Sequence, residues 1–178
     1  MGTRTLNWRV LLALSAASLL ALAAWAAPIK DPGKKTSPEI RSLAGIKRIG
    51  VAVAPPPPMM RQADLKRPEL RQAVVTMLTE AGFEVVAKRE KFLPILRFEL
   101  LTASDPKFEN AAGFFLVMAL RQPVDLRRFE LRMYTNTYQG FVVGLEGRKD
   151  LNEKVTTGVE TLVKQFIALQ NQAGQTPD

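Results

Sequence analysis

Hydrophobic residues between positions 40 and 169 recur at spacings that predict both strands and helices. The run Ile49 to Ala54 is continuously small or β-branched, which is typical of a strand covered on both faces. A helix then begins at Pro68, ends at Gly82 and is followed by a second strand, Phe83 to Val86. The apolar face of this helix consists of Leu70, Val74, Met77, Leu78 and Ala81. Strand, helix and strand in this order favour a right-handed crossover and a parallel strand pair.

Alternating residues in the second half of the chain predict further strands. Leu96, Phe98 and Leu100 share one face of the segment 94–102. The run Phe114 to Leu120 fits either a strand or a buried helix, and the flanking Gly113 and Pro123 favour the strand. Residues 129–138 also alternate. We expect Phe129, Leu131 and Met133 to face the core, and the outward face to consist of Glu130, Arg132, Tyr134, Asn136 and Tyr138.

A last amphipathic helix begins after Asn152, and its apolar stripe is Val155, Val159, Leu162, Val163, Phe166 and Leu169. Such a stripe must pack on another layer, and the sheet is the available partner. We therefore predict an α/β (α+β) fold, a two-layer sandwich in which two main helices pack on a mixed sheet of about five strands. Residues 40–170 form this single domain, and a disordered tail, 171–178, follows it.

Four consecutive prolines, Pro55 to Pro58, end the first strand and predict a stiff surface connection. Met59 and Met60 follow them. Because methionine is flexible and polarisable, the pair either forms an adaptable docking surface or folds back over the edge of the core. The sequence leaves both readings open.

The N-terminus has the pattern of an export signal. Arg4 and Arg9 precede the uncharged, Leu- and Ala-rich segment Val10 to Ala27, and Ala24 and Ala26 supply small residues for cleavage. We predict a signal peptide, 1–26, and a Pro- and Lys-rich flexible linker, 27–39, which place the mature protein in the periplasm or outside the cell without a membrane span. The alternative is an uncleaved signal anchor in the inner membrane. Lipid acylation at the cleavage site is not expected, because the chain has no Cys.

Composition narrows the possible chemistry. The 178 residues contain neither Cys nor His, which excludes disulfides and the usual thiol, Ser-His, zinc and haem sites, so we expect no cofactor and no metal centre. Removing Arg4 and Arg9 lowers the formal net charge from +8 to +6. A basic exported domain attracts anionic lipids, acidic glycans or acidic proteins, although solubility alone also accounts for the charge. Nucleic acid is not an expected partner, because no recognisable module interleaves the basic residues with aromatics.

Two groups of polar residues are candidates for function. Glu99 and Glu130 could face the same side of neighbouring strands as a hydrolytic carboxylate pair, or each could simply pair with Arg97 and Arg132. The other candidate is a binding face, which could equally be an ordinary solvated surface, composed of Arg97, Arg132, Tyr134, Asn136 and Tyr138.

The leader, the strand sequence IGVAVAPP, the strand sequence GFEVV and the late helix occur in an order that resembles a known class of exported domains. These are the small α/β domains at the N-terminus of TolB and in auxiliary lipoproteins of ABC-type envelope transport systems. The resemblance implies a non-catalytic module for envelope assembly or docking. We therefore expect an exported accessory protein that binds another envelope protein. A module for anionic lipid or glycan is the alternative, followed by a carboxylate-dependent hydrolase.

Overall fold

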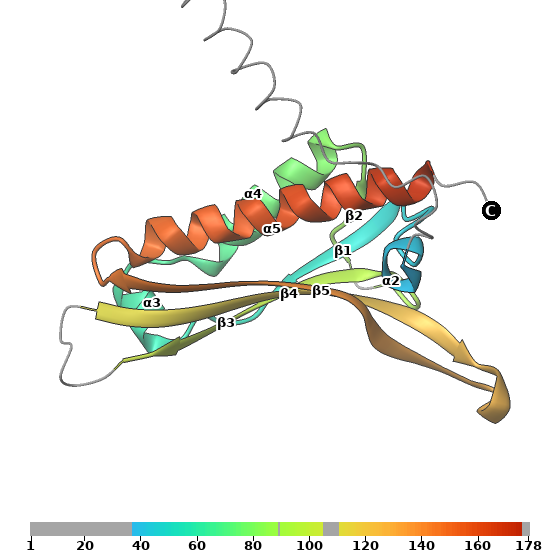
Figure 1. Cartoon of the computed structure of the whole chain (residues 1–178), viewed down its shortest axis with the longest axis horizontal. Helices are drawn as coiled ribbons and strands as arrows, with labels where there is room; N and C mark the ends of the chain where they lie inside the picture. Colours follow the sequence, from blue (N-terminus) through green and yellow to red (C-terminus); the bar gives the residue numbers. More distant parts are fainter. Residues whose placement is uncertain (1–36, 89, 105–110, 176–178) are drawn as a thin grey trace, which may run out of the picture. The chain divides into compact units, whose positions relative to one another are not determined.

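A mixed sheet of five strands in the order β2-β1-β3-β4-β5 carries the fold (Figure 1). The computed structural model describes residues 37–88, 90–104 and 111–175. Strand β1 runs parallel to β2 and β3, whereas β3, β4 and β5 are antiparallel neighbours. The strands are β1 (Arg48–Val53), β2 (Glu84–Val86), β3 (Ile95–Ala103), β4 (Ala111–Leu126) and β5 (Leu131–Gly147). The mixed sheet, the parallel β1–β2 pair and the strand at Phe114 to Leu120 are confirmed.

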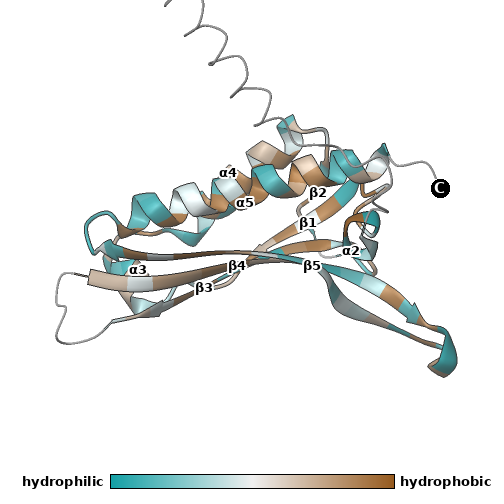
Figure 2. Cartoon of the chain, viewed as in Figure 1, coloured by the Kyte–Doolittle hydropathy of each residue, from teal (hydrophilic) through white to brown (hydrophobic). Residues whose placement is uncertain are grey.

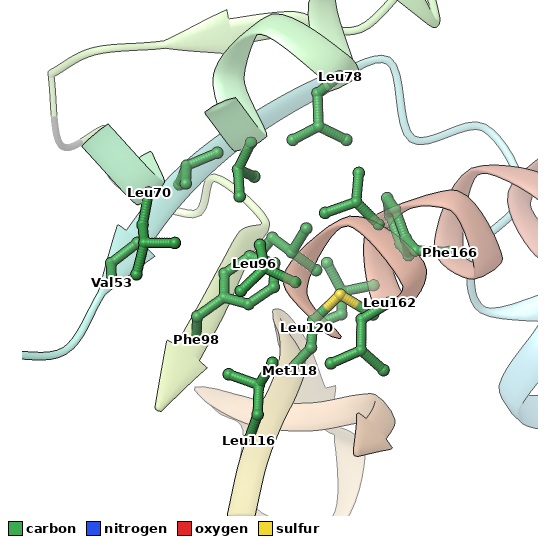
Figure 3. Close-up of a cluster of buried hydrophobic side chains, with 14 of the residues drawn as sticks. Val53, Leu70, Leu78, Leu96, Phe98, Leu116, Met118, Leu120, Leu162 and Phe166 are labelled. Atoms are coloured by element: carbon green, nitrogen blue, oxygen red, sulfur yellow. The ribbon is translucent and has the colours of Figure 1, made fainter. Parts of the chain in front are cut away.

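Two long helices, α4 (Arg67–Glu80) and α5 (Leu151–Gly174), cover one face of this sheet (Figure 1). Between the layers lies a core of buried side chains (Figure 3). Within it the ring of Phe166, from α5, packs 5.8 Å, centroid to centroid, from the ring of Phe83. Burying one such side chain stabilises a protein by about 1.5–3 kcal/mol. The two-layer sandwich with two main helices is therefore confirmed.

Shorter helices precede β1 and α4 along the chain. Helix α2 (Pro38–Arg41) is capped by Ser37, whose hydroxyl accepts from the backbone N–H of Ile40 at 3.3 Å. Helix α3 (Pro58–Gln62) follows the extended prolines, and α5 continues to Gly174, past the predicted end of the domain at 170. Ala173 is buried in the core and continues the apolar stripe of α5, four residues after Leu169.

The leader, 1–26, and most of the linker, 27–39, lie outside the described residues. The proposed division of the chain into leader, linker, domain and tail therefore stays a prediction. None of the described helices combines the length and hydrophobicity that crossing a bilayer requires.

An extra residue in β5 changes which side chains share a face. Leu120 pairs with Tyr138, but the next residue, Arg121, pairs with Asn136, so Thr137 is a β-bulge. Gln122 stabilises this bulge, because its side-chain amide donates to Thr137 Oγ1 at 2.8 Å and to the carbonyl of Ser42 at 3.0 Å. An inserted residue inverts the strand's alternation. The prediction that Tyr138 lies on the same face as Tyr134 is therefore wrong.

Beyond Arg121 the sheet narrows to a ribbon of two strands, because β3 pairs with β4 only as far as that residue. We call residues 122–135 the β4–β5 arm; a single turn of 3₁₀ helix, Arg127–Phe129, closes its tip (Figure 1). Phe129, Leu131 and Met133 are 68%, 53% and 44% exposed. The prediction that these three face the core is wrong, because no other described strand or helix extends over the end of the arm.

Candidate functional site

The sheet face opposite α4 and α5, here called the open face, bears an exposed apolar cluster. Five large hydrophobic side chains from three adjacent strands are between 37% and 75% exposed. We call this cluster the open-face patch, and it consists of Leu101, Phe115, Phe141, Val143 and Leu145. Contiguous exposed hydrophobic surface of this kind marks an interaction site more often than single exposed residues do.

Strand register brings the patch together. Leu101 pairs with Phe115, which pairs with Val143, so these three side chains form one row across the strands. The rings of Phe115 and Phe141 lie 5.8 Å apart and are tilted by 38°, a favourable arrangement for two aromatic side chains. The patch therefore contains an aromatic pair, Phe115 and Phe141, on the adjacent strands β4 and β5.

The composition of β5 explains why its large residues face outward. Gly140 and Gly144 occupy the face that packs against the core, where a methyl group on Gly140 would lie 3.0 Å from Leu162 and one on Gly144 would lie 2.4 Å from Phe114. Phe141, Val143 and Leu145 alternate with them and so face away from the helices. Sequence reasoning missed these three residues. The signal that could have found them is an alternation in which glycine, rather than the large residue, takes the core position.

Polar residues border the patch at one end. Arg97, Glu99, Arg121, Tyr134, Asn136 and Gln139 line a shallow hollow on the open face. Arg97 Nη2 donates to Glu99 Oε2 at 3.2 Å, whereas the Arg121 guanidinium lies 6.0 Å from the Tyr134 ring. Among the described residues, no carboxylate lies within ion-pair distance of Arg121. The border therefore presents charges of both signs and one cation without a described counterion.

Of the residues predicted for a binding face, Arg97, Tyr134 and Asn136 meet at this border. Tyr134 also has an internal contact, because its hydroxyl donates to the carbonyl of Leu93 at 3.2 Å. Its outward position agrees with the alternation in the sequence, which holds up to the bulge.

Arg132 lies further along the arm and is engaged on both sides. It makes a two-pronged pair with Asp125, in which Nη2 donates to Oδ2 at 2.7 Å, and it stacks 4.7 Å from the Phe92 ring centroid. The hydrogen bonds lower the pKa of Asp125 and raise the pKa of Arg132. Arg132 therefore ties the two strands of the arm together.

The remaining predicted residues lie elsewhere. Tyr138 faces the helices, 6.2 Å from the Phe166 ring, and burial raises the pKa of its phenol. Met60 is fully buried and Met59 half-buried in α3, which agrees with methionines that fold back over the core edge. The structure therefore does not bring the seven predicted residues to one surface.

The two candidate carboxylates do not meet. Glu99 lies in the row of Val117 and Phe141, whereas Glu130 follows the arm's tip beyond Leu126, nine residues further along β4. At the rise of a β-strand this separation is on the order of 30 Å, far beyond the spacing of a glycosidase pair. Within the described ranges, no three acidic residues gather where they could hold a metal ion.

The described core contains no room for an organic ligand beneath the prolines. An apolar space between Phe98, Leu70 and Val155 has a volume of only about 20 Å³. This is roughly the space that one water molecule needs. The open face is therefore the better candidate for recognition.

No family model and no curated protein matches this chain. Solved structures that resemble it include a minor lipoprotein from Acinetobacter baumannii, at 11% identity over 71% of this chain and 95% of that one, with a TM-score of 0.39. A neuraminyllactose-binding hemagglutinin homologue from Helicobacter pylori is 11% identical over 84% and 96%, with a TM-score of 0.42. Rare lipoprotein B from Shewanella oneidensis is 10% identical over 72% and 91%, with a TM-score of 0.28.

Lipoproteins are thus among the solved structures that resemble this chain, while the expected likeness to TolB stays a prediction. At these TM-scores no activity, ligand or site residue is transferred from any of them.

Proposed function

We propose that this chain is an exported, non-catalytic accessory protein that docks onto another envelope protein through the open-face patch. The observation that carries the proposal is the patch itself, in which five large apolar side chains from three strands stand exposed around the Phe115–Phe141 pair. Covering such a patch removes apolar area from water, which drives most protein association.

The layout of the open face favours a protein partner. Protein interfaces have an apolar, often aromatic centre and a polar border, and a few central side chains carry most of the binding energy. Phe115 and Phe141 occupy the centre here, and Arg97, Glu99 and Arg121 lie at the border. A partner that offers an apolar surface edged by an acidic group would pair with Arg121.

Export is the second part of the proposal, and it rests on the leader at positions 1–26. The proposed location is the periplasm or the exterior of the cell. The absence of Cys and His from the sequence and the separation of Glu99 from Glu130 support a binding role over a catalytic one.

Photo-crosslinking in intact cells tests the docking face. A benzoylphenylalanine at position 141 should form an adduct with one envelope protein, whereas the same group at Thr161, exposed on α5, should not. The protein so identified should co-purify with the unmodified chain. Co-purification should fall at least tenfold with the variant Phe141→Thr/Val143→Thr/Leu145→Thr, which keeps β-branched side chains on the strand.

A matched control is Phe129→Thr/Leu131→Thr, which removes exposed apolar groups from the arm instead and should leave co-purification unchanged. Circular dichroism verifies that both variants fold. The proposal would be overturned if the unmodified chain, the open-face variant and the arm variant co-purified equal amounts of the envelope protein. It would also be overturned if position 141 formed adducts only between copies of this chain.

A further inference from the structure

The tip of the β4–β5 arm is a second exposed apolar surface, separate from the open-face patch. Leu126, Phe129, Leu131 and Met133 are all at least 36% exposed, and hydrophobic and hydrophilic segments alternate along the arm (Figure 2). The tip turns within Arg127–Phe129 and returns through Glu130, which adopts a left-handed conformation with φ of 49°. Leu126 pairs with Leu131, and Val124 pairs with Met133, so these apolar side chains share one face of the two-stranded ribbon, and Phe129 lies in the turn at its end.

Charge at the tip is mainly positive. Arg127 and Arg128 are exposed, and in the described part of the chain neither forms an ion pair with a carboxylate. The Arg128 guanidinium instead lies 5.7 Å from the Phe129 ring centroid. Arg132 is already neutralised by Asp125, so Glu130 is the single acidic group left to oppose the two free guanidinium groups.

We infer that this tip docks on the surface of an anionic phospholipid bilayer. Phe129 and Leu131 enter the boundary between head groups and acyl chains, and Arg127 and Arg128 bind lipid phosphates. Amphipathic helices that combine aromatic and aliphatic side chains with Lys and Arg lie about 5–10 Å deep in this boundary, and the tip offers the same combination on a turn. The long stems of the arginines also permit their charged ends to remain at the head groups.

The geometry favours a bilayer over a protein for this surface. A protein interface is a patch that the partner covers from one side, as the open face offers. The tip instead presents a narrow apolar face at the end of a protruding ribbon, next to two exposed arginines, and such an end can enter the head-group region of a bilayer. From Arg121 to Leu126 the arm extends roughly 17 Å past the last pairing with β3, far enough for its tip to reach lipid while the sheet stays in water.

A position-specific fluorophore tests the inference, because the chain has no native Cys and a single introduced Cys is labelled uniquely. The full chain carrying an environment-sensitive dye at Phe129→Cys is mixed with vesicles of phosphatidylglycerol and phosphatidylcholine. We expect a blue-shifted emission several-fold brighter than in buffer, and little change with vesicles of pure phosphatidylcholine. A dye at Thr161→Cys, on the exposed side of α5, should stay in water with both kinds of vesicle.

A second variant tests how much the two arginines contribute to vesicle binding. Each basic residue near an anionic surface adds about fivefold to partitioning, so Arg127→Gln/Arg128→Gln should raise the lipid concentration for half-maximal signal about 30-fold. Raising the salt should act in the same direction. Phe141→Thr/Val143→Thr/Leu145→Thr should leave the signal at position 129 unchanged, which separates this inference from the docking proposal.

Three results would overturn the inference. The dye at position 129 could remain in water with anionic vesicles, it could respond no more than the dye at position 161, or it could respond to the crosslinked envelope protein and not to lipid.

Discussion

The ring of Phe114 lies against the α-carbon of Gly144 on the neighbouring strand, so closely that a methyl group on Gly144 would stand 2.4 Å from Phe114 Cε1. Phe114 is buried between the sheet and the helices and has little room to move. Any side chain at position 144 therefore competes with the core for the same space.

We expect Gly144→Ala to lower the free energy of unfolding by about 1–3 kcal/mol, the usual cost of overpacking a core. Urea denaturation followed by circular dichroism measures this change. Gly113→Ala is the matched control, because its methyl group would meet its nearest neighbour only at 3.7 Å. Equal stability of the two variants would contradict the packing described here.

The ring of Phe166 packs between two other aromatic rings, with centroid distances of 5.8 Å to Phe83 and 6.2 Å to Tyr138. Phe166→Ala should destabilise the protein by about 3–5 kcal/mol through lost burial and the cavity left behind. In contrast, Phe141→Ala on the open face should cost less than about 1 kcal/mol, because Phe141 is 67% exposed. Thermal unfolding of both variants tests the contrast, and similar losses would show that Phe141 is not solvent-exposed.

The phenol of Tyr138 should ionise at a higher pH than a free phenol. Burial raises its pKa above 10.0, since the charged phenolate loses solvation between the sheet and α5. The variant Tyr134→Phe leaves Tyr138 as the sole tyrosine, and its phenolate absorbance gives the pKa directly.

The same shift predicts how stability depends on pH. Because the folded pKa exceeds the unfolded value, the contribution of Tyr138 is complete below pH 10.0 and is lost as the pH rises through the folded pKa. The variant Tyr138→Phe should not show this loss. A folded-state pKa of Tyr138 at or below 10.0 would contradict its placement facing the core.

The pair between Asp125 and Arg132 should make the arm sensitive to acid. Hydrogen bonds from Arg132 hold the pKa of Asp125 below its usual 3.8, so the stabilisation is present above 3.8 and is lost as the pH falls through the lowered pKa. Hydrogen exchange should then speed up in residues 122–135 before the rest of the sheet is affected.

Asp125→Asn should reproduce this faster exchange at neutral pH, where the acid form of Asp125 is otherwise absent. Lys164→Gln removes an exposed pair on α5, at 3.7 Å from Glu160, and should leave the arm unchanged. Unaltered exchange in the arm of Asp125→Asn would show that the pair does not hold its strands together.

The candidate site was predictable only in part. Arg97, Tyr134 and Asn136 lie on the open face as their alternation indicates, whereas Tyr138 does not, because Thr137 is inserted between them. The apolar centre of the site was missed, since Phe115 and Phe141 look like core residues when only their hydrophobicity is known. Whether a large apolar residue is buried depends on whether another layer of the fold packs over it, and the residue's own segment does not show this.

The sequence by itself determined the elements and their layers. The stripe of Val155, Val159 and Leu162 predicts a helix that packs on another layer, and the order of strand, helix and strand favours the parallel pair of β1 and β2. The tertiary structure decided which face each side chain of β5 occupies and how far the neighbouring strands extend. The reason is physical: alternation is a local, relative pattern that one bulge inverts, whereas burial is a property of the whole fold.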